Sequence, residues 1–306
     1  MSSLPGARLV GDVVVLKFGG AALANPGRIR LAALRLEHWR RAGARPVAVV
    51  SACGGATDRI LRWISAVTRD VPRGDRESDR ALATGEDLAA SLVAAALGAR
   101  GIPATGLRGG EAGLVATGHH GRGRITRVDD GPLRALLDQG RVPVVSGFQA
   151  FTRSGDTVTL GRGASDLTAV RVAATLGAPE CHLVKDVPGI HDRDPRAHHD
   201  AELLRDLSPS RLLRLTRNGA AVVQREAAVA AASLGVTLRI YGFRDPVFGR
   251  HGTTVSGGGQ RRGVAPARPG SRRELERRGD SGPGKGKGLR LSSRTAGPPD
   301  PSRTLR

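Results

Sequence analysis

The residues best suited to chemistry follow the ends of apolar segments. The first are in VVVLKFGG (Val13–Gly20), where four apolar residues lead to Lys17 and then to Gly19 and Gly20. An apolar run of this length ended by glycines predicts a buried parallel strand followed by a tight turn. The glycines expose backbone N–H groups and Lys17 adds a positive charge, a combination that suits a polyphosphate. Judged on this stretch alone, an ordinary strand-to-helix turn without a ligand is an equally good interpretation.

Polar groups occur at three further positions of the same kind. They are Ser51 with Gly54, Gly55 and Thr57, then Arg162 with Ser165 and Asp166, and finally Lys185 with Asp186. Open α/β sheets bind ligands at the carboxyl ends of their strands, so we expect all of these groups to meet at one edge of a sheet.

Two of the charged side chains indicate the kind of ligand. Arg162 can hold a carboxylate through two parallel hydrogen bonds, although an exposed arginine without a partner is the alternative. Glu86 lies in an otherwise apolar helix, ATGEDLAASL, where it either faces solvent or pairs with a ligand cation. If Arg162 binds a carboxylate, Glu86 an ammonium and Lys17 phosphates, the ligands are an amino acid and a nucleotide bound side by side.

The elements that position these residues alternate along the chain. We expect the apolar runs to form strands, residues 148–160 to form a hairpin that turns at 154–156, and residues 68–80 and 118–127 to form polar loops. The expected strands are 13–18, 46–52, 104–107, 114–117, 142–147, 181–185 and 237–241, and the expected helices are 26–42, 57–67, 79–97, 133–137, 165–176, 209–215 and 220–234. Thr57 and the Ser165–Asp166 pair are predicted to cap helices. Alternation of this kind predicts a mostly parallel sheet covered by helices on both faces.

Composition excludes several classes of protein. Of 306 residues 39% are apolar but only 3% aromatic, which predicts a core of aliphatic side chains and alanine. The formal net charge is +20, but residues 257–306 alone hold 13 Lys or Arg against 4 Asp or Glu, and no basic patch is interleaved with aromatic residues that could stack on bases. We therefore expect no nucleic-acid partner. We expect a folded domain over 1–255 and a disordered basic tail over 256–306.

Location and metal content follow from a few residues. Two cysteines, Cys53 and Cys181, do not make a disulfide framework and fit a reducing cytoplasm. The N-terminus has no signal-peptide pattern, and no apolar run approaches the length of a membrane span. His119 and His120 lack a third ligand, so they are expected to be solvated and not to bind a metal.

In its motifs the chain resembles the catalytic domain of the aspartate kinases, which belong to the amino-acid kinase superfamily. The resemblance covers about residues 11–255. The motifs are KFGG at 17–20, VVSACGGATD at 49–58, TGED at 84–87, VVSGFQ at 144–149, LGRGASDLTA at 160–169 and DVPGIHDRDPR at 186–196.

This resemblance implies a fold, an activity and a set of site residues. The fold is a three-layer αβα sandwich with a mostly parallel eight-stranded sheet, and the activity is transfer of the γ-phosphoryl group of ATP, with Mg²⁺, to the side-chain carboxylate of aspartate. A cytoplasmic homodimer acting on an acidic amino acid is expected. The resemblance makes Lys17, Gly19, Gly20 and Asp166 catalytic, places Ser51, Thr57, Glu86, Arg162 and Ser165 around the acceptor, and places Lys185, Asp186, His191 and Arg196 along the nucleotide.

Several positions depart from the family's usual sequence. Ala21 and Ala22 replace a Thr-Ser pair, and Ala164 replaces the third glycine of GRGGSD. Lys185 and His191 stand where a threonine and an aromatic residue are usual, and Ala221 stands where a lysine is usual. We hypothesise that Lys185 supplies the charge lost at Ala221.

These departures keep two alternatives open. The first is a specialised paralogue that phosphorylates another acidic small molecule, and the second is a catalytically silent binding or regulatory protein. The family's C-terminal ACT regulatory domains have no counterpart after residue 255, so regulation through them is not expected.

Overall fold

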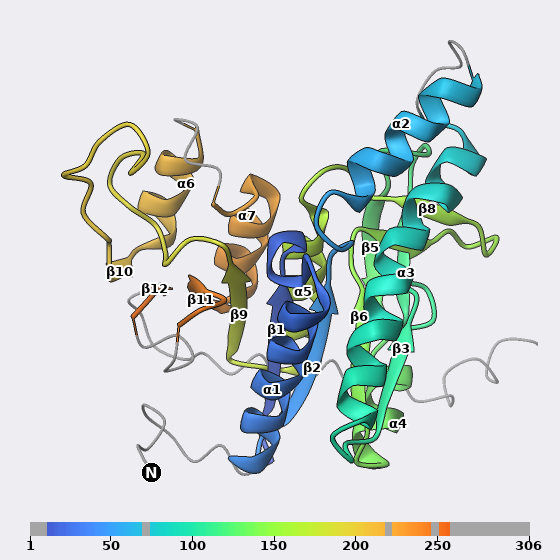
Figure 1. Ribbon diagram of the computed structural model, residues 1–306, viewed down its shortest axis with the longest axis horizontal. Helices are drawn as coiled ribbons and strands as arrows, with labels where there is room; N and C mark the ends of the chain where they lie inside the picture. The colour runs from blue at the N-terminus through green and yellow to red at the C-terminus, as the bar shows by residue number, and fades with distance from the viewer. Residues whose placement is uncertain (1–10, 69–73, 218–221, 246–250, 258–306) are drawn as a thin grey trace, which may run out of the picture. The chain divides into compact units, whose positions relative to one another are not determined.

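The computed structural model describes residues 11–68, 74–217, 222–245 and 251–257 (Figure 1). Eight strands form one sheet in the order β10-β12-β11-β9-β1-β2-β6-β3, and every neighbouring pair is parallel except β11 with β12. The strands are β1 (Val13–Phe18), β2 (Arg45–Val50), β3 (Ala104–Leu107), β6 (Val142–Ser146), β9 (Glu180–Lys185), β10 (Asp206–Leu207), β11 (Thr237–Gly242) and β12 (Thr253–Val255). The predicted mostly parallel sheet is confirmed.

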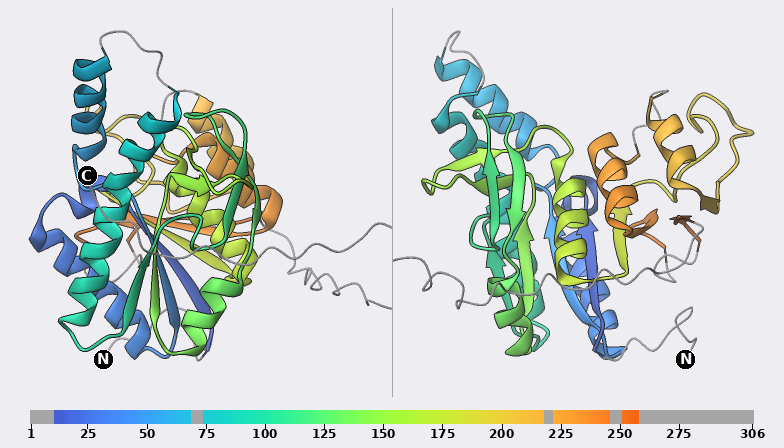
Figure 2. Two further views of the ribbon diagram at one scale, coloured as in Figure 1. Left: turned by 90° about the vertical axis from the view of Figure 1, so that its right-hand side faces the viewer. Right: turned by 180° about the vertical axis from the view of Figure 1, so that it is seen from behind.

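Helices lie against both faces of this sheet. In Figure 1 α1 (Pro26–Arg41) and α3 (Arg76–Gly98) lie in front of the sheet, and α2 (Ala56–Thr68) extends beyond its edge. Seen from behind, α4 (Gly131–Asp138), α5 (Ala164–Leu176) and α7 (Arg225–Leu234) cover the other face (Figure 2). The remaining helices are α6 (Pro209–Arg217), which packs against α7, and the short 3₁₀ helix η1 (Gly20–Leu23) that follows β1.

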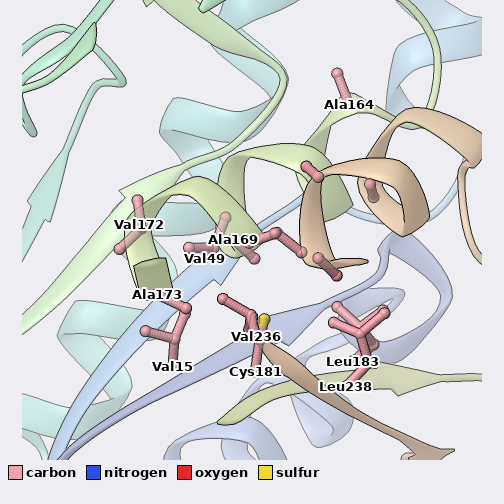
Figure 3. Close-up of a cluster of buried hydrophobic side chains, with 14 of the residues drawn as sticks. Val15, Val49, Ala164, Ala169, Val172, Ala173, Cys181, Leu183, Val236 and Leu238 are labelled. Atoms are coloured by element: carbon pink, nitrogen blue, oxygen red, sulfur yellow. The ribbon is translucent and has the colours of Figure 1, made fainter. Parts of the chain in front are cut away.

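Burial on two sides explains the continuous apolar strands. Val15 of β1 points toward α5, where it joins a cluster that includes Ala169 and Ala173 (Figure 3). Its neighbours Val14 and Leu16 belong to the cluster on the α1 and α3 side. A strand covered on both faces has no position that favours a polar side chain, so it does not alternate.

A second sheet was not predicted from the sequence. Its order is β5-β4-β7-β8, formed by β4 (Leu114–Thr117), β5 (Arg124–Val128), β7 (Gln149–Phe151) and β8 (Thr157–Thr159). The predicted hairpin is confirmed, because β7 pairs with β8 in antiparallel fashion. The predicted loop over 118–127 is wrong from Arg124 onward, since β5 is largely exposed and its arginines hid the strand pattern.

Three predicted helix starts are corrected. α2 begins at Ala56, so Thr57 lies inside the helix and does not cap it. α3 begins at Arg76, within the predicted loop 68–80, because the side chain of Asp75 accepts a hydrogen bond from the N–H of Ser78 at 2.7 Å and caps the helix. α5 begins at Ala164 after Gly163, which has a left-handed φ of 78°, so Ser165 and Asp166 lie in the first turn.

Two further predictions concern the C-terminal part of the chain. α7 begins at Arg225, whereas a helix was predicted from residue 220; residues 220 and 221 lie outside the described ranges. Of the predicted tail, only residues 256 and 257 are described.

α3 is the one helix, within the described ranges, that is long and apolar enough to cross a membrane by length and composition. Of its most apolar window 44% is buried inside the protein. It packs on α1 and carries the buried carboxylate of Glu86 toward the turn after β2. These contacts are those of a core helix in a globular domain.

Candidate functional site

The candidate site lies where the chain leaves neighbouring strands in opposite directions. β1 and β9 are adjacent and parallel, but β1 is followed by α1 on one face, while α7 on the opposite face lies between β9 and β11 along the chain. The strand order of an open sheet reverses at such a point, and a crevice for ligands forms beyond the strand ends. Lys17 is the second-last residue of β1, and Lys185 is the last residue of β9.

Three charged side chains meet in this crevice. The ammonium of Lys17 lies 2.7 Å from Oδ1 of Asp166, and that of Lys185 donates to Oδ2 of the same carboxylate at 2.6 Å. Asp166 comes from the first turn of α5, and its side chain is 3% exposed. One carboxylate thus holds two ammonium groups, each on its own oxygen.

The environment changes the acidity of this group of residues. Burial by itself would raise the pKa of Asp166, but the ammonium groups of Lys17 and Lys185 hold it at about 2. Burial, together with the neighbouring charge of Lys17, lowers the pKa of Lys185 to about 8 against the opposing effect of Asp166. At neutral pH the three side chains carry a net charge close to +1.

Glycines let two turns approach each other beside these charges. A Cβ at Gly20 would lie 2.7 Å from the carbonyl oxygen of Ala52, and one at Gly54 would lie 2.9 Å from Cβ of Ala24. The turn after β1 therefore packs directly on the turn after β2, which begins at half-buried Ser51. The N–H of Gly19 is used in a 3.2 Å hydrogen bond to the carbonyl of Val184, so it is not free for a ligand in this conformation.

Glu86 is buried beneath the turn after β2. Only 3% of the residue is exposed, and Oε1 accepts a hydrogen bond from the N–H of Ala52 at 2.9 Å. Oε2 is buried without a hydrogen-bond partner among the described residues. Burial raises the pKa of this carboxyl to about 7, because the effect of burial is larger than the lowering effect of the hydrogen bond from Ala52. The solvent-facing alternative for Glu86 is wrong.

A polar network next to Glu86 was missed in the sequence. Oδ1 of Asp87 accepts hydrogen bonds from Oγ of Ser146 and from Nε2 of Gln149, each at 2.8 Å. The network ties α3 to β6 and β7, and burial raises the pKa of Asp87. The signal was the second carboxylate of TGED together with the polar residues of VVSGFQ.

Arg162 lies in the turn between β8 and α5, with Gly161 and Gly163 on either side at φ of 87° and 78°. Its side chain is 76% exposed, and its guanidinium lies 3.5 Å from the exposed carboxylate of Asp58 in α2. Asp58 directly follows Thr57, so the first turn of α2 and this turn face each other. An exposed pair at this distance is weak, and it leaves the guanidinium available.

Ser165 and Asp79 fix the surroundings of that turn. Ser165 packs so closely on Gly147 that a Cβ there would lie 2.7 Å from the Cβ of the serine. The buried carboxylate of Asp79, also missed in the sequence, accepts bonds from the N–H and Oγ1 of Thr159 at 2.8 and 2.6 Å and from the N–H of Gly121 at 2.9 Å. It thereby holds the end of β8, three residues before Arg162.

One histidine prediction is corrected here. His120 is half-buried and its Nδ1 lies 3.1 Å from Oδ2 of Asp79, so it is not simply solvated, whereas its neighbour His119 is exposed.

The predicted nucleotide residues are less closely grouped. Asp186 is exposed directly after Lys185, His191 forms an isolated bridge with Leu203, and Arg196 is exposed. Within the described ranges, no hydrogen bond or ion pair connects the side chains of His191 or Arg196 to the three central charges. Ala221 lies outside those ranges.

A cavity of about 600 Å³ adjoins Asp186 on the α1 side. Its wall includes Phe243, with the guanidinium of Arg28 over the ring at 4.3 Å and that of Arg244 at 5.5 Å. The volume is typical of a small-molecule site. These cations were not predicted, because Arg28 and Arg244 lie outside the motifs.

The chain is similar to known proteins over most of its length. The model of the amino acid kinase family matches residues 12–242. An aspartate kinase of Pseudomonas fluorescens is 36% identical over 228 residues, 74% of this chain and 55% of that protein, and an aspartokinase of Corynebacterium glutamicum is 37% identical over 246 residues, 80% of this chain and 57% of that protein. The chain therefore spans about half the length of these relatives.

Solved structures give the same fold. An aspartate kinase from Synechocystis superposes with a TM-score of 0.69 at 33% identity, over 80% of this chain and 40% of that one. Escherichia coli aspartokinase III in complex with aspartate and ADP also superposes with a TM-score of 0.69, at 22% identity over 82% of this chain and 66% of that one, which shows a shared fold.

Proposed function

Because this chain belongs to the amino acid kinase family, we propose that it transfers the γ-phosphoryl group of ATP to the side-chain carboxylate of aspartate or a close acidic analogue. The observation that carries the proposal is the buried ammonium of Lys17, fixed by Asp166 at the end of β1 next to two glycines. A preorganised cation in a crevice shielded from water suits a phosphoryl group whose charge shifts during transfer.

The acceptor would be held from two sides. Arg162 binds a carboxylate of the acceptor, and the free Oε2 of Glu86 pairs with its ammonium group. Ser51, Thr57 and Ser165 are its further expected contacts. This arrangement selects a molecule that carries both charges, which is the pattern of an acidic amino acid.

The chemistry needs no covalent intermediate and no strong general base. An ionised carboxylate oxygen of the acceptor attacks the γ-phosphorus, and the bond from that phosphorus to the bridging oxygen breaks, leaving its electron pair on ADP. Lys17 neutralises the charge on the transferring group, while Asp166 keeps the Lys17 ammonium in one position. The chain contributes alignment and charge, which can account for most of a phosphoryl-transfer rate.

ATP would lie between Lys17 and the segment after β9, where Lys185, Asp186, His191 and Arg196 are its expected contacts. Mg²⁺ would supply further neutralisation of the phosphates. The described residues contain no group of three or more His, Cys, Asp or Glu side chains close enough to hold a metal ion. That fits a cation held mainly by phosphate oxygens, as is usual for Mg²⁺. We further propose a cytoplasmic homodimer as the working form.

The test is a hydroxamate-trapping assay for acyl phosphate with Mg-ATP and a panel of acidic amino acids. Hydroxamate formed with aspartate supports the full proposal. Formation with a different acidic acceptor supports the specialised paralogue instead. No product and no acceptor-dependent ADP release with any member of the panel would contradict an enzymatic role and favour a silent binding protein.

A further inference from the structure

We propose that Lys185 is a second catalytic cation, whose ammonium contacts the phosphoryl group together with that of Lys17 while the group is transferred. This inference rests on the proposed function and adds a named role for one residue of the same site. The starting point is the position of Lys185 in the sheet. β1 and β9 are parallel with Phe18 opposite Val184, so Lys185, the last residue of β9, lies level with Gly19.

The next step is the sharing of Asp166. Its Oδ1 lies beside Lys17 and its Oδ2 beside Lys185, and within the described ranges no other carboxylate lies within ion-pair distance of either ammonium. An ammonium has three N–H donors, so each lysine keeps donors for a ligand after bonding Asp166. The carboxylate therefore positions two cations without exhausting either one.

The charge balance indicates what these donors face. One lysine would be enough to neutralise buried Asp166, yet the second is also largely buried, with 14% of its side chain exposed. An uncompensated charge in such a place is costly unless a partner of opposite sign binds there. A phosphoryl group in transfer, with negative charge on three oxygens, is such a partner.

Other charges around Lys185 do not provide that compensation. Lys17 on β1 adds repulsion, and Cys181 on its own strand is a buried thiol whose pKa burial raises, so it stays neutral. Asp186 attracts Lys185 but is exposed to solvent, where its charge is screened. Asp166 is shared, so the pair of ammonium groups keeps a surplus positive charge.

The transfer step that Lys185 would assist is balanced without a proton. A bond forms between the acceptor carboxylate oxygen and the γ-phosphorus, and the bond to the bridging oxygen breaks with its electron pair remaining on ADP. Lys185 stays an ammonium throughout, donating hydrogen bonds to phosphoryl oxygens. A role limited to holding ATP would affect binding of the nucleotide, whereas a role in transfer affects the rate of the bound complex.

The experiment compares Lys185→Met and Lys185→Arg with the wild-type chain, and uses Arg30→Met as a matched control that removes an exposed cation from α1. Single-turnover transfer is measured at saturating Mg-ATP with the acceptor identified by hydroxamate trapping, and the Kd of Mg-ATP is measured separately. For Lys185→Met we expect a rate lower by about 10²–10³-fold, as for loss of one preorganised electrostatic group, and an ATP Kd changed less than about tenfold. Arg30→Met should match the wild type.

A pH profile separates a catalytic cation from a structural one. Since the pKa of Lys185 is lowered to about 8, the wild-type transfer rate should fall above that pH. Lys185→Arg, which stays charged, should recover part of the rate and lose the alkaline fall. If Lys185→Met does not fold, the profile of Lys185→Arg decides: an alkaline limb unchanged from the wild type contradicts the proposal.

Two further results would overturn the inference. A Lys185→Met variant with the wild-type transfer rate and ATP affinity removes Lys185 from the site, and a weakened ATP affinity with an unchanged transfer rate at saturating Mg-ATP makes it a nucleotide contact only. Both leave the proposed function intact. A wild-type chain that transfers no phosphoryl group to any acceptor contradicts the proposed function itself, and this inference with it.

Discussion

Glu86 and Ala52 are joined by a buried hydrogen bond of 2.9 Å, from the backbone N–H of Ala52 to Oε1 of the carboxylate. The bond attaches α3 to the turn after β2 and leaves Oε2 without a partner among the described residues. Burial raises the pKa of the carboxyl to about 7. A group that is buried, half-satisfied and titrating near neutrality is typical of a ligand-binding position.

Acceptor affinity should therefore depend on pH. Only ionised Glu86 can pair with an ammonium, and with a pKa of about 7 its ionised fraction falls as the pH is lowered from 8 to 6. We expect the KM for the acceptor to rise by about tenfold over that range, from the change in ionised fraction. Initial rates at several pH values measure it. In Glu86→Gln the KM should be high and independent of pH in this range; a flat wild-type KM would exclude Glu86 from acceptor binding.

The same residue should cost stability. The folded-state pKa of about 7 exceeds the usual 4.5, so the penalty is absent below pH 4.5, grows between the two values and is complete above pH 7. Glu86→Gln removes this penalty. The difference in the free energy of unfolding between Glu86→Gln and the wild type should therefore change in favour of the variant from pH 5 to pH 8, by on the order of 2 kcal/mol. Denaturant unfolding at both pH values tests this, and an equal difference at both would contradict it.

Lys17 provides the most direct test of the catalytic centre. Lys17→Met should lower turnover by about 10²–10³-fold, because one preorganised electrostatic partner of the transferring group is lost. ATP affinity should fall much less, since the charge matters mainly while negative charge shifts. Turnover and the Kd of Mg-ATP are measured on the same preparation. Near-wild-type turnover would place the chemistry elsewhere in the chain.

Asp166 should hold the two lysines and the fold together. Asp166→Asn leaves two ammonium groups facing each other in a buried position, and loss of one partner from a buried ionic group costs about 3–5 kcal/mol. Because the pKa of Lys185 is lowered to about 8, deprotonation above that pH relieves the repulsion. The destabilisation should thus be larger at pH 6 than at pH 9. Thermal or denaturant unfolding at the two pH values provides the comparison, and a loss that grows with pH would contradict it.

Much of the fold could be predicted because the strands carry a strong signal. β1, β2, β6 and β9 are continuous apolar runs that end in small or polar residues, and burial on both faces of the sheet is the physical reason. β5 gave no such signal, because its exposed arginines are tolerated on an open face. The start of α3 was missed for a similar reason, since its first turn is charged and its cap at Asp75 resembles a loop.

Contacts between distant segments were harder to predict than the elements. The sequence placed Lys17, Asp166 and Lys185 at strand ends, but sharing of one carboxylate depends on β9 lying beside β1, which no local pattern specifies. The hydrogen bonds between Asp79 and Thr159 join residues that are 80 positions apart, and no local sequence pattern predicts them either. Side chains that act through tertiary contacts become visible only when the strand order is known.

Arg162 is the residue that we expect to bind the acceptor carboxylate. Its side chain is 76% exposed, and its one ion pair among the described residues is a 3.5 Å contact with exposed Asp58. The turn that carries it is held by the hydrogen bonds between Asp79 and Thr159 at the end of β8. Because the guanidinium is largely exposed and its pair with Asp58 is weak, Arg162→Ala should leave the Tm unchanged. It should raise the KM for the acceptor by about 10–100-fold, as expected for loss of a charge-assisted hydrogen bond, with ATP affinity nearly constant.

Arg162→Lys sharpens this prediction, because a point charge cannot reproduce the two parallel hydrogen bonds of a guanidinium and should recover only part of the affinity. Arg153→Ala, which removes an exposed arginine from the turn between β7 and β8, serves as the matched control and should behave as the wild type. Acceptor and ATP KM values for the four proteins decide the matter. Equal losses for both substrates in Arg162→Ala, or full recovery by lysine, would show that Arg162 does not bind the acceptor through its fork of N–H groups.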